Sequence, residues 1–176
     1  MHLWGAALSV LFAVNSNVDQ LKSRLEMGYA ATEEAKALLQ DEKYSDAALC
    51  FADALNLGRK PALALQEIQA DGNEEALVWL IDICCESALL NLNHLDNLDQ
   101  ARSDAWAACV FSQYGNHKPL ECMKLVCVKQ KDLMGELQAC NQLLSLSNGE
   151  LSDERERAII TSRLLEIEQE LLEQSN

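Results

Sequence analysis

The sequence predicts an all-α fold, and its composition is the main reason. Its 176 residues include 31 Leu and 22 Ala but only 7 Val, 6 Ile and 2 Thr. Leu and Ala favour helices, whereas the β-branched residues that favour strands are scarce. Only 2 Pro and 7 Gly interrupt the chain, and 49% of its residues are hydrophobic. Such a chain can bury a sizeable core, as one domain or as one short helical array.

Residues 1–16 form the first expected element. Residues 3–14 are mostly apolar, and the run is too short to cross a bilayer as a helix. We expect an apolar N-terminal helix that packs into the array. A signal peptide is the alternative, since the length of the run and the small residues near position 16 fit one. The absence of Lys and Arg before the run argues against that alternative.

Two helices with apolar residues at helical spacing are predicted next. The first covers residues 18–40, with Asn17 as its N-cap. A turn at residues 41–43 leads to the second helix, Tyr44–Leu57.

The segment after this second helix contains a glycine and a proline that signal helix boundaries. Gly58 is typical of the residue that ends a helix, and Pro61 is typical of a helix start. We therefore expect the helix to end at Leu57. A shorter helix then covers residues 62–70 and is closed by residues 71–73.

The second half of the chain contains further helical segments separated by turn-forming residues. The predicted helices cover residues 74–92, 98–113, 119–131 and 133–146. A last helix, residues 153–173, begins with Asp153 and Glu156 at the spacing of a capping box. Its outer side is rich in Glu, as in a helix that closes a repeat array, and a coiled-coil contact is the alternative. The expected organisation is an N-terminal element (1–16), a helical array (17–149) and a C-terminal capping helix (150–176).

One helix carries an alternation of small and aromatic side chains. Four residues spaced by 3, 4 and 3 positions share one face of it: Tyr44, Ala47, Phe51 and Ala54. The small side chains let a neighbouring helix approach closely, and the aromatic rings fill the gaps beside them. This alternation resembles the second helix of a tetratricopeptide repeat (TPR), a helix–turn–helix unit of about 34 residues.

The resemblance extends, with departures, over three units. They cover about residues 28–57, 82–111 and 122–146. The second unit keeps small residues at Ala101 and Ala108, and Ala105 stands where the family usually has an aromatic residue. In the first unit Ala35 and Leu38 stand where the family prefers Gly and Tyr. The interval from Ala47 in the first unit to Ala101 in the second is 54 residues, longer than the repeat of about 34 residues. The resemblance therefore implies an irregular, right-handed stack of antiparallel helix pairs, and a generic helical bundle is the alternative.

The TPR resemblance also implies a binding surface. In that family the first helix of each pair lines a concave face that binds protein segments. Carried over by position, the candidate partner-binding residues are Tyr29, Thr32, Lys36, Leu39, Ile83, Glu86, Leu90 and Asn93. The best-known clamp of the family holds a C-terminal carboxylate with Lys and Asn. Here Thr32 and Lys36 stand at those places and Glu86 adds a negative charge, so a clamp for a chaperone tail is not expected.

The charge of the chain restricts its partners. The net charge is −14, from 14 basic and 28 acidic residues, and the densest basic pieces are Arg59-Lys60 and Lys129–Lys131. Nucleic acids and anionic lipids need a basic face, so neither is an expected partner. We expect a protein or peptide partner that is basic or neutral.

The sequence contains no recognisable catalytic or cofactor motif. It has no Gly-rich phosphate loop, G-x-S-x-G, H-E-x-x-H or C-x-x-C pattern. His94 and His117 are interpreted as surface loop residues, and Trp79 and Trp106 as core residues. The seven Cys lie mostly in apolar helical segments and are interpreted as core thiols of a reducing compartment, not as disulfides or metal ligands. We therefore expect no catalytic residue, no cofactor and no metal.

These observations favour a non-catalytic adaptor that binds a protein segment on its helical-repeat surface. A structural subunit of a larger assembly, docked through the N-terminal apolar run and the C-terminal helix, is the alternative. An enzyme or metal protein is a third hypothesis, motivated only by the seven thiols. The expected location is cytoplasmic or nuclear, or secreted or organellar if the first 16 residues are a cleaved leader.

Overall fold

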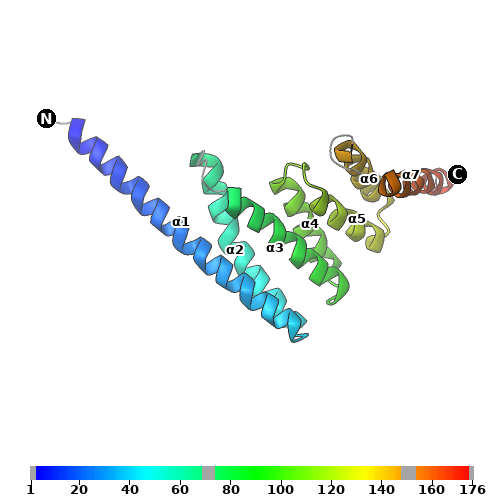
Figure 1. Cartoon of the computed structure of the whole chain (residues 1–176), viewed down its shortest axis with the longest axis horizontal. Helices are drawn as coiled ribbons and strands as arrows, with labels where there is room; N and C mark the ends of the chain where they lie inside the picture. Colours follow the sequence, from blue (N-terminus) through cyan, green and yellow to red (C-terminus); the bar gives the residue numbers. More distant parts are fainter. Residues whose placement is uncertain (1–2, 69–73, 148–153, 175–176) are drawn as a thin grey trace. The chain divides into compact units, whose positions relative to one another are not determined.

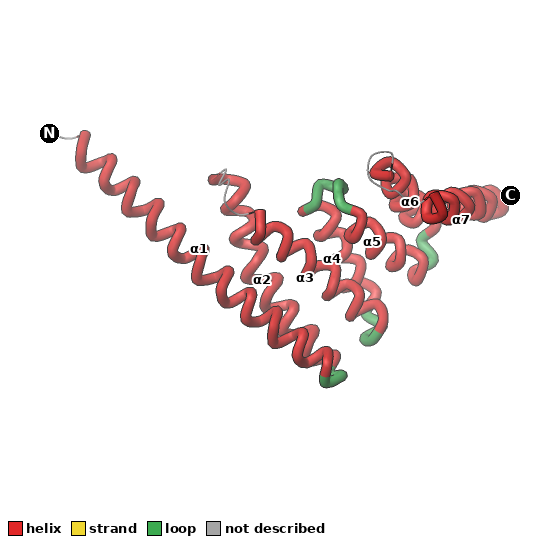
Figure 2. Tube along the Cα trace, in the orientation of Figure 1, coloured by secondary structure: helices red, strands yellow, loops and turns green. Residues whose placement is uncertain are grey.

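Helices account for almost all of the described chain. In the computed structural model the described residues are 3–68, 74–147 and 154–174, and they form helices joined by short turns (Figure 2). The helices labelled in Figure 1 are α1 (Leu3–Gln40), α2 (Tyr44–Ile68), α3 (Glu74–Asn93), α4 (Leu98–Phe111), α5 (His117–Gln130), α6 (Leu133–Ser147) and α7 (Glu154–Gln174). The prediction of an all-α fold is confirmed.

The predicted boundaries of α3 to α7 agree with the structure to within two residues. Local capping explains two of these boundaries. The side-chain oxygen of Asn97 accepts a hydrogen bond from the Gln100 N–H at 3.3 Å, and that of Asn116 accepts one from the Lys118 N–H at 3.1 Å. Asp153, the predicted first residue of the capping box, lies outside the described residues.

The predicted break near Asn17 was wrong, because α1 continues from Leu3 to Gln40. The residues around Asn17 include neither Gly nor Pro, and an Asn inside a helix costs at most about 0.7 kcal/mol relative to Ala. That cost is too small to interrupt a long helix. The boundary expected between residues 16 and 17 therefore lies inside one element.

The predicted end of a helix at Leu57 was also wrong. Helix α2 continues through Gly58 and Pro61 to Ile68, so the separate helix expected over residues 62–70 is the last part of α2. Gly58 is buried within the helix. Residues 62–65 are Ala and Leu, strong helix formers, and they extend the helix beyond the proline.

The chain forms two compact units, residues 1–77 and 78–176. In the first unit α1 and α2 pack side by side as an antiparallel pair (Figure 1). The helix face predicted from the TPR-like spacing is buried, because Ala47, Phe51 and Ala54 have no exposed surface, and Ala35 of α1 is equally buried. The alternation of small and aromatic residues therefore belongs to the core.

In the second unit consecutive helices pack against one another. Helix α5 contacts both α4 and α6, and α6 contacts α7. One hydrophobic cluster contains residues of all four helices: Cys109, Leu120, Cys140, Leu143, Ile160 and Leu164. This cluster sets the positions of α4 to α7.

Helix α3 joins the second unit through polar contacts. The Ser87 hydroxyl donates a hydrogen bond of 2.7 Å to Oδ2 of Asp104 on α4, and Gln100 Nε2 donates one of 2.9 Å to Oδ1 of the same carboxylate. Asp104 is fully buried, so both of its oxygens need such donors. On α5, Lys118 Nζ lies 2.7 Å from Asp82 Oδ1.

We predict that Ala47→Trp destabilises the first unit by about 1–3 kcal/mol, because an indole does not fit a fully buried position between packed helices. Ala52→Trp is the matched control, since Ala52 is exposed on the same helix. Urea unfolding followed by circular dichroism measures both variants. Equal stability of the two would contradict the packing described for this face.

Candidate functional site

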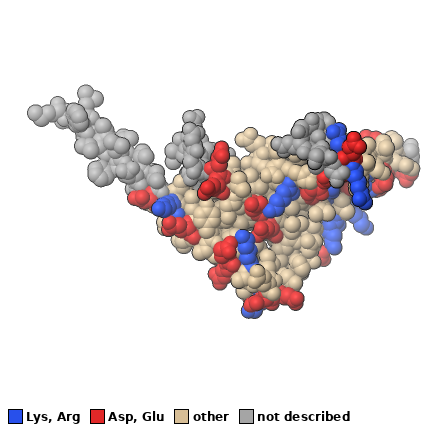
Figure 3. Space-filling model, in the orientation of Figure 1, with Lys and Arg blue, Asp and Glu red and all other residues tan. Residues whose placement is uncertain are grey.

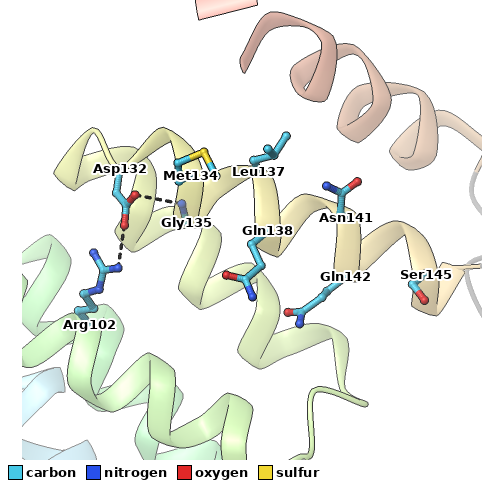
Figure 4. Close-up of a pocket in the computed structure, with 9 residues that line it drawn as sticks. All are labelled: Arg102, Asp132, Met134, Gly135, Leu137, Gln138, Asn141, Gln142 and Ser145. Atoms are coloured by element: carbon cyan, nitrogen blue, oxygen red, sulfur yellow. Dashed lines mark hydrogen bonds and ion pairs between the residues drawn. The ribbon is translucent and has the colours of Figure 1, made fainter. Parts of the chain in front are cut away.

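The candidate functional site is a groove in the second unit. It has a volume of about 650 Å³ and follows α6 (Figure 4). The residues that line it are Arg102, Asp132, Met134, Gly135, Leu137, Gln138, Asn141, Gln142 and Ser145. All of them belong to α6 except Arg102, which lies on α4, and Asp132, which precedes α6.

Asp132 fixes the start of α6 and ties it to α4. Its Oδ1 accepts a hydrogen bond of 3.0 Å from the Gly135 N–H, as an N-cap residue does, and its Oδ2 lies 2.7 Å from Nη2 of Arg102. The Gly135 N–H and the Arg102 guanidinium hold the pKa of this carboxyl below its ordinary value. Asp132 is therefore ionised at neutral pH, and the ion pair closes one end of the groove.

Gly135 allows α6 to approach α5 closely. A Cβ at this position would lie 2.7 Å from Cys127 Sγ and 2.7 Å from Asp132 Oδ2, which is inside van der Waals contact. The chain reverses just before this point, where Lys131 ends α5 with a left-handed φ of 58°. The close approach of α6 to α5 at this point therefore leaves little room for a side chain at 135 unless Cys127 or Asp132 moves.

Amide side chains dominate the exposed side of α6. Gln138 and Gln142 are one helical turn apart and project to the same side in Figure 4, and Asn141 and Ser145 are also one turn apart. Each amide group offers N–H donors and a carbonyl acceptor, the same groups that a peptide main chain offers. This amide row (Gln138, Asn141, Gln142) can therefore hydrogen-bond to the backbone of a bound segment.

A second hollow of about 280 Å³ adjoins the groove and shares four residues with it, Arg102, Gly135, Gln138 and Gln142. Trp106 and Tyr114 line this second hollow. The prediction that Trp106 is a core residue was wrong, because 57% of its surface is exposed. An exposed Trp beside a concave surface is typical of protein-binding sites.

Glu136 holds the opposite side of α6 against α7. It is only 2% exposed, and its two oxygens accept hydrogen bonds from Arg163, at 2.7 Å from Nε and 3.0 Å from Nη2. These contacts raise the pKa of Arg163 above its ordinary value. Because Glu136 and Gln138 point to nearly opposite sides of the helix, anchoring Glu136 turns the amide row outward.

The structure places the eight predicted partner-binding residues in three environments. Three are exposed, two are half-buried and three are buried; in that order they are Tyr29, Lys36 and Asn93, then Leu39 and Glu86, then Thr32, Ile83 and Leu90. Thr32 donates its hydroxyl to the Gly28 carbonyl of its own helix at 2.9 Å. The buried three are core side chains and not surface positions, which corrects that part of the expectation. None of the eight lines the groove along α6.

The prediction that most cysteines are core residues is confirmed. Six are buried, Cys50 is half-buried, and all seven are free thiols. Burial, with Cys122 and Cys127 nearby, raises the pKa of Cys109 to about 12, so this thiol is not ionised at neutral pH.

The two described histidines have different environments. His94 lies in the exposed turn after α3, as predicted. His117 was predicted to lie in a loop, but the side chain of Asn116 caps α5 one residue earlier, so His117 is in the first turn of α5. Its Nε2 lies 3.1 Å from Oε1 of Glu156 on α7.

Charged groups of both signs lie close together on the face drawn in Figure 3. Among the described residues several charged groups form ion pairs, for example Lys124 with Glu121 at 2.6 Å. Among the helices that the structure describes, none combines the length and the apolar character needed to cross a membrane.

Comparisons with known proteins identify no family. No protein-family model matches the sequence. A search of curated proteins finds no significant match. The resemblance to TPR arrays therefore rests on the spacing of small and aromatic residues alone.

We predict that Gly135→Ala destabilises the second unit by about 1–3 kcal/mol, because the added methyl group would overlap Cys127 Sγ and Asp132 Oδ2. Adding Cys127→Ala to this variant should recover part of the loss by making room on one side. Chemical denaturation of the single and double variants measures both effects. A Gly135→Ala variant as stable as the unmodified chain would show that α5 and α6 are not packed this closely.

Proposed function

We propose that this chain is a non-catalytic protein-binding module that holds a segment of a partner protein in the groove along α6. The observation that carries the proposal is the amide row on the exposed side of α6, beside the exposed ring of Trp106. Amides can pair with main-chain groups of many sequences, and a Trp ring supplies a large apolar contact. The combination suits recognition of a peptide segment.

The proposed partner segment is basic or neutral. The chain carries a net charge of −14, which disfavours association with an acidic ligand. Charges on exposed surfaces are screened over about 8 Å at physiological salt. Association with a basic segment should therefore slow as the salt concentration rises, whereas the hydrogen bonds to the amide row should persist.

The TPR-like character supports the same class of function. Helix pairs packed through small residues leave extended surfaces, and repeat proteins of this kind use such surfaces to bind other proteins. We extend this property to the present chain as part of the proposal. The proposed site is on α6, whereas the family pattern points to α1 and α3.

A library of random peptides, panned against the immobilised full chain, tests the proposal. We expect enrichment of a family of peptides, and the Gln138→Ala/Gln142→Ala double variant should bind them about tenfold more weakly or worse, because two hydrogen-bonding amides are lost. Gln169→Ala is the matched control, since Gln169 is an exposed amide on α7 and pairs with Glu173. Its affinity should be unchanged.

Two outcomes would refute this function. One is the failure of the folded chain to enrich any peptide family. The other is equal affinity of the selected peptides for the double variant and the unmodified chain, which would place the binding surface elsewhere.

A second candidate function is a structural subunit that docks through its C-terminal helix. Leu165 and Leu172 on α7 are 64% and 67% exposed and lie seven residues apart, so they share one side of the helix. Exposed leucines at this spacing are typical of a helix that packs against another helix.

We predict that, under this second candidate function, the unmodified chain self-associates or remains bound to a copurifying subunit. Leu165→Glu/Leu172→Glu should then abolish that association, because charged groups would enter an apolar contact. Sedimentation velocity of the unmodified chain and of the double variant measures this association. A monomeric, partner-free unmodified chain would leave the peptide-binding module as the surviving proposal.

A further inference from the structure

A cluster of metal-ligating side chains lies between α5 and α7, apart from the groove. It consists of His117 and Glu121, one turn apart on α5, and Glu156 in the first turn of α7. We propose that this His–Glu cluster binds one divalent transition-metal ion, with Zn²⁺ as the ion that fits its donors. The proposal departs from the sequence-based expectation of no metal, which treated His117 as a surface residue.

The three donor atoms are already close enough to share one ion. Nε2 of His117 lies 3.1 Å from Oε1 of Glu156 and 4.0 Å from Oε1 of Glu121, and one donor atom from each residue lies within 4.8 Å of the others. In a tetrahedral zinc site with Zn–N and Zn–O distances near 2.0 Å, donor atoms are separated by roughly 3.3 Å. Small side-chain rotations would therefore bring all three to one ion.

The imidazole nitrogen supplies independent support. Nε2 of His117 is buried and has no hydrogen-bond partner within the described part of the chain, although a carboxylate oxygen is 3.1 Å away. A buried nitrogen that contacts a carboxylate without a well-aligned hydrogen bond is incompletely satisfied. A metal ion between Nε2 and the carboxylates would satisfy all of these atoms together.

Core packing holds the two helices at this separation. Leu120 on α5 and Ile160 on α7 belong to the same buried hydrophobic cluster. Leu120 is next to Glu121 in the sequence, and Ile160 is one turn after Glu156. The ligands are thus supported by fixed helices and not by a loop.

The donor set selects among ions. One imidazole and two carboxylates suit Zn²⁺, with a water as the fourth ligand, whereas Mg²⁺ and Ca²⁺ prefer oxygen donors alone. His117 and Glu156 are 38% and 36% exposed as side chains, so the same side-chain rotations that bring the donors to one ion can open a path from solvent to Nε2. The bound ion would link α7 to α5 and so stabilise the packing of α7 in the second unit.

Lys124 competes with the ion for one ligand. Its Nζ lies 2.8 Å from Oε1 and 2.6 Å from Oε2 of Glu121. The carboxylate would be shared or released on metal binding, so removal of the ammonium group should increase the affinity for zinc. A cluster with a purely structural ion-pair role would show no such gain.

Calorimetric titration of the reduced full chain with zinc chloride tests the proposal. We expect one Zn²⁺ per chain, with magnesium chloride giving no binding. His117→Gln and Glu156→Gln should each weaken zinc binding at least tenfold, whereas Lys124→Met should strengthen it severalfold. The matched controls are His94→Gln and Glu168→Gln, which change an exposed histidine in a turn and an exposed carboxylate of α7.

Loading the chain with Co²⁺ distinguishes a site at the His–Glu cluster from a site formed by cysteine thiolates. The absorption spectrum of the Co²⁺-loaded chain should lack a thiolate-to-cobalt charge-transfer band, because the proposed donors are nitrogen and oxygen. Circular dichroism of each variant without metal verifies that it is folded. The proposal is overturned by a thiolate band, by unchanged zinc affinity in both ligand variants, or by no binding of millimolar zinc to the folded chain.

Discussion

Close packing of helices at small residues is the constraint on which the rest of the structure depends. In the first unit the buried face of α2 contains Ala47 and Ala54, with Phe51 between them. In the second unit α4 buries Ala101 and Ala105 in the same way. Small side chains bring helix axes together, and the larger neighbours fill the remaining space, so each helix has a fixed rotation about its axis. A fixed rotation decides which side chains of that helix remain exposed.

The exposed side of α6 follows from such constraints. Gly135 permits the close approach to α5, Asp132 joins the start of the helix to Arg102, and Glu136 pairs with Arg163 of α7. The buried Glu136 is tolerated because Arg163 supplies an opposite charge with good hydrogen-bond geometry. With three contacts fixing its rotation, α6 presents a defined row of amides. Because the backbone of the helix is already ordered, a ligand that binds this row costs little backbone entropy, and only the amide side chains become further ordered.

Most of the fold could be predicted from the sequence because its signals are local. The helices from Glu74 onward have clear starts and stops in Asn97, Asn116 and the turn residues between them, and their boundaries agree with the structure. The extents of the two long helices, α1 and α2, were not predicted correctly. Gly58 and Pro61 are strong local signals of a break, yet the neighbouring helix formers and the pairing of α1 with α2 keep α2 continuous.

The candidate site could not be predicted, because its residues come together only in three dimensions. Arg102 and Asp132 are 30 positions apart in the sequence, and the importance of Gly135 depends on the position of Cys127 on another helix. From the sequence alone, Gln138 and Gln142 look like ordinary polar residues of a helix surface. Trp106 lies in an apolar helical segment and was therefore predicted to be a core residue, but 57% of its surface is exposed. The His–Glu cluster could not be predicted for the same reason, because Glu156 is 35 positions after Glu121 in the sequence.

Binding of a partner segment along α6 is most directly tested by nuclear magnetic resonance of the ¹⁵N-labelled chain with a peptide selected by panning. Side-chain NH₂ signals report each amide separately, and the indole N–H reports Trp106. Shifts should concentrate on the NH₂ groups of Gln138, Asn141 and Gln142 and on the Trp106 indole. Shifts confined to α1, for example around Tyr29 and Lys36, with the α6 amides unchanged, would contradict a binding groove on α6.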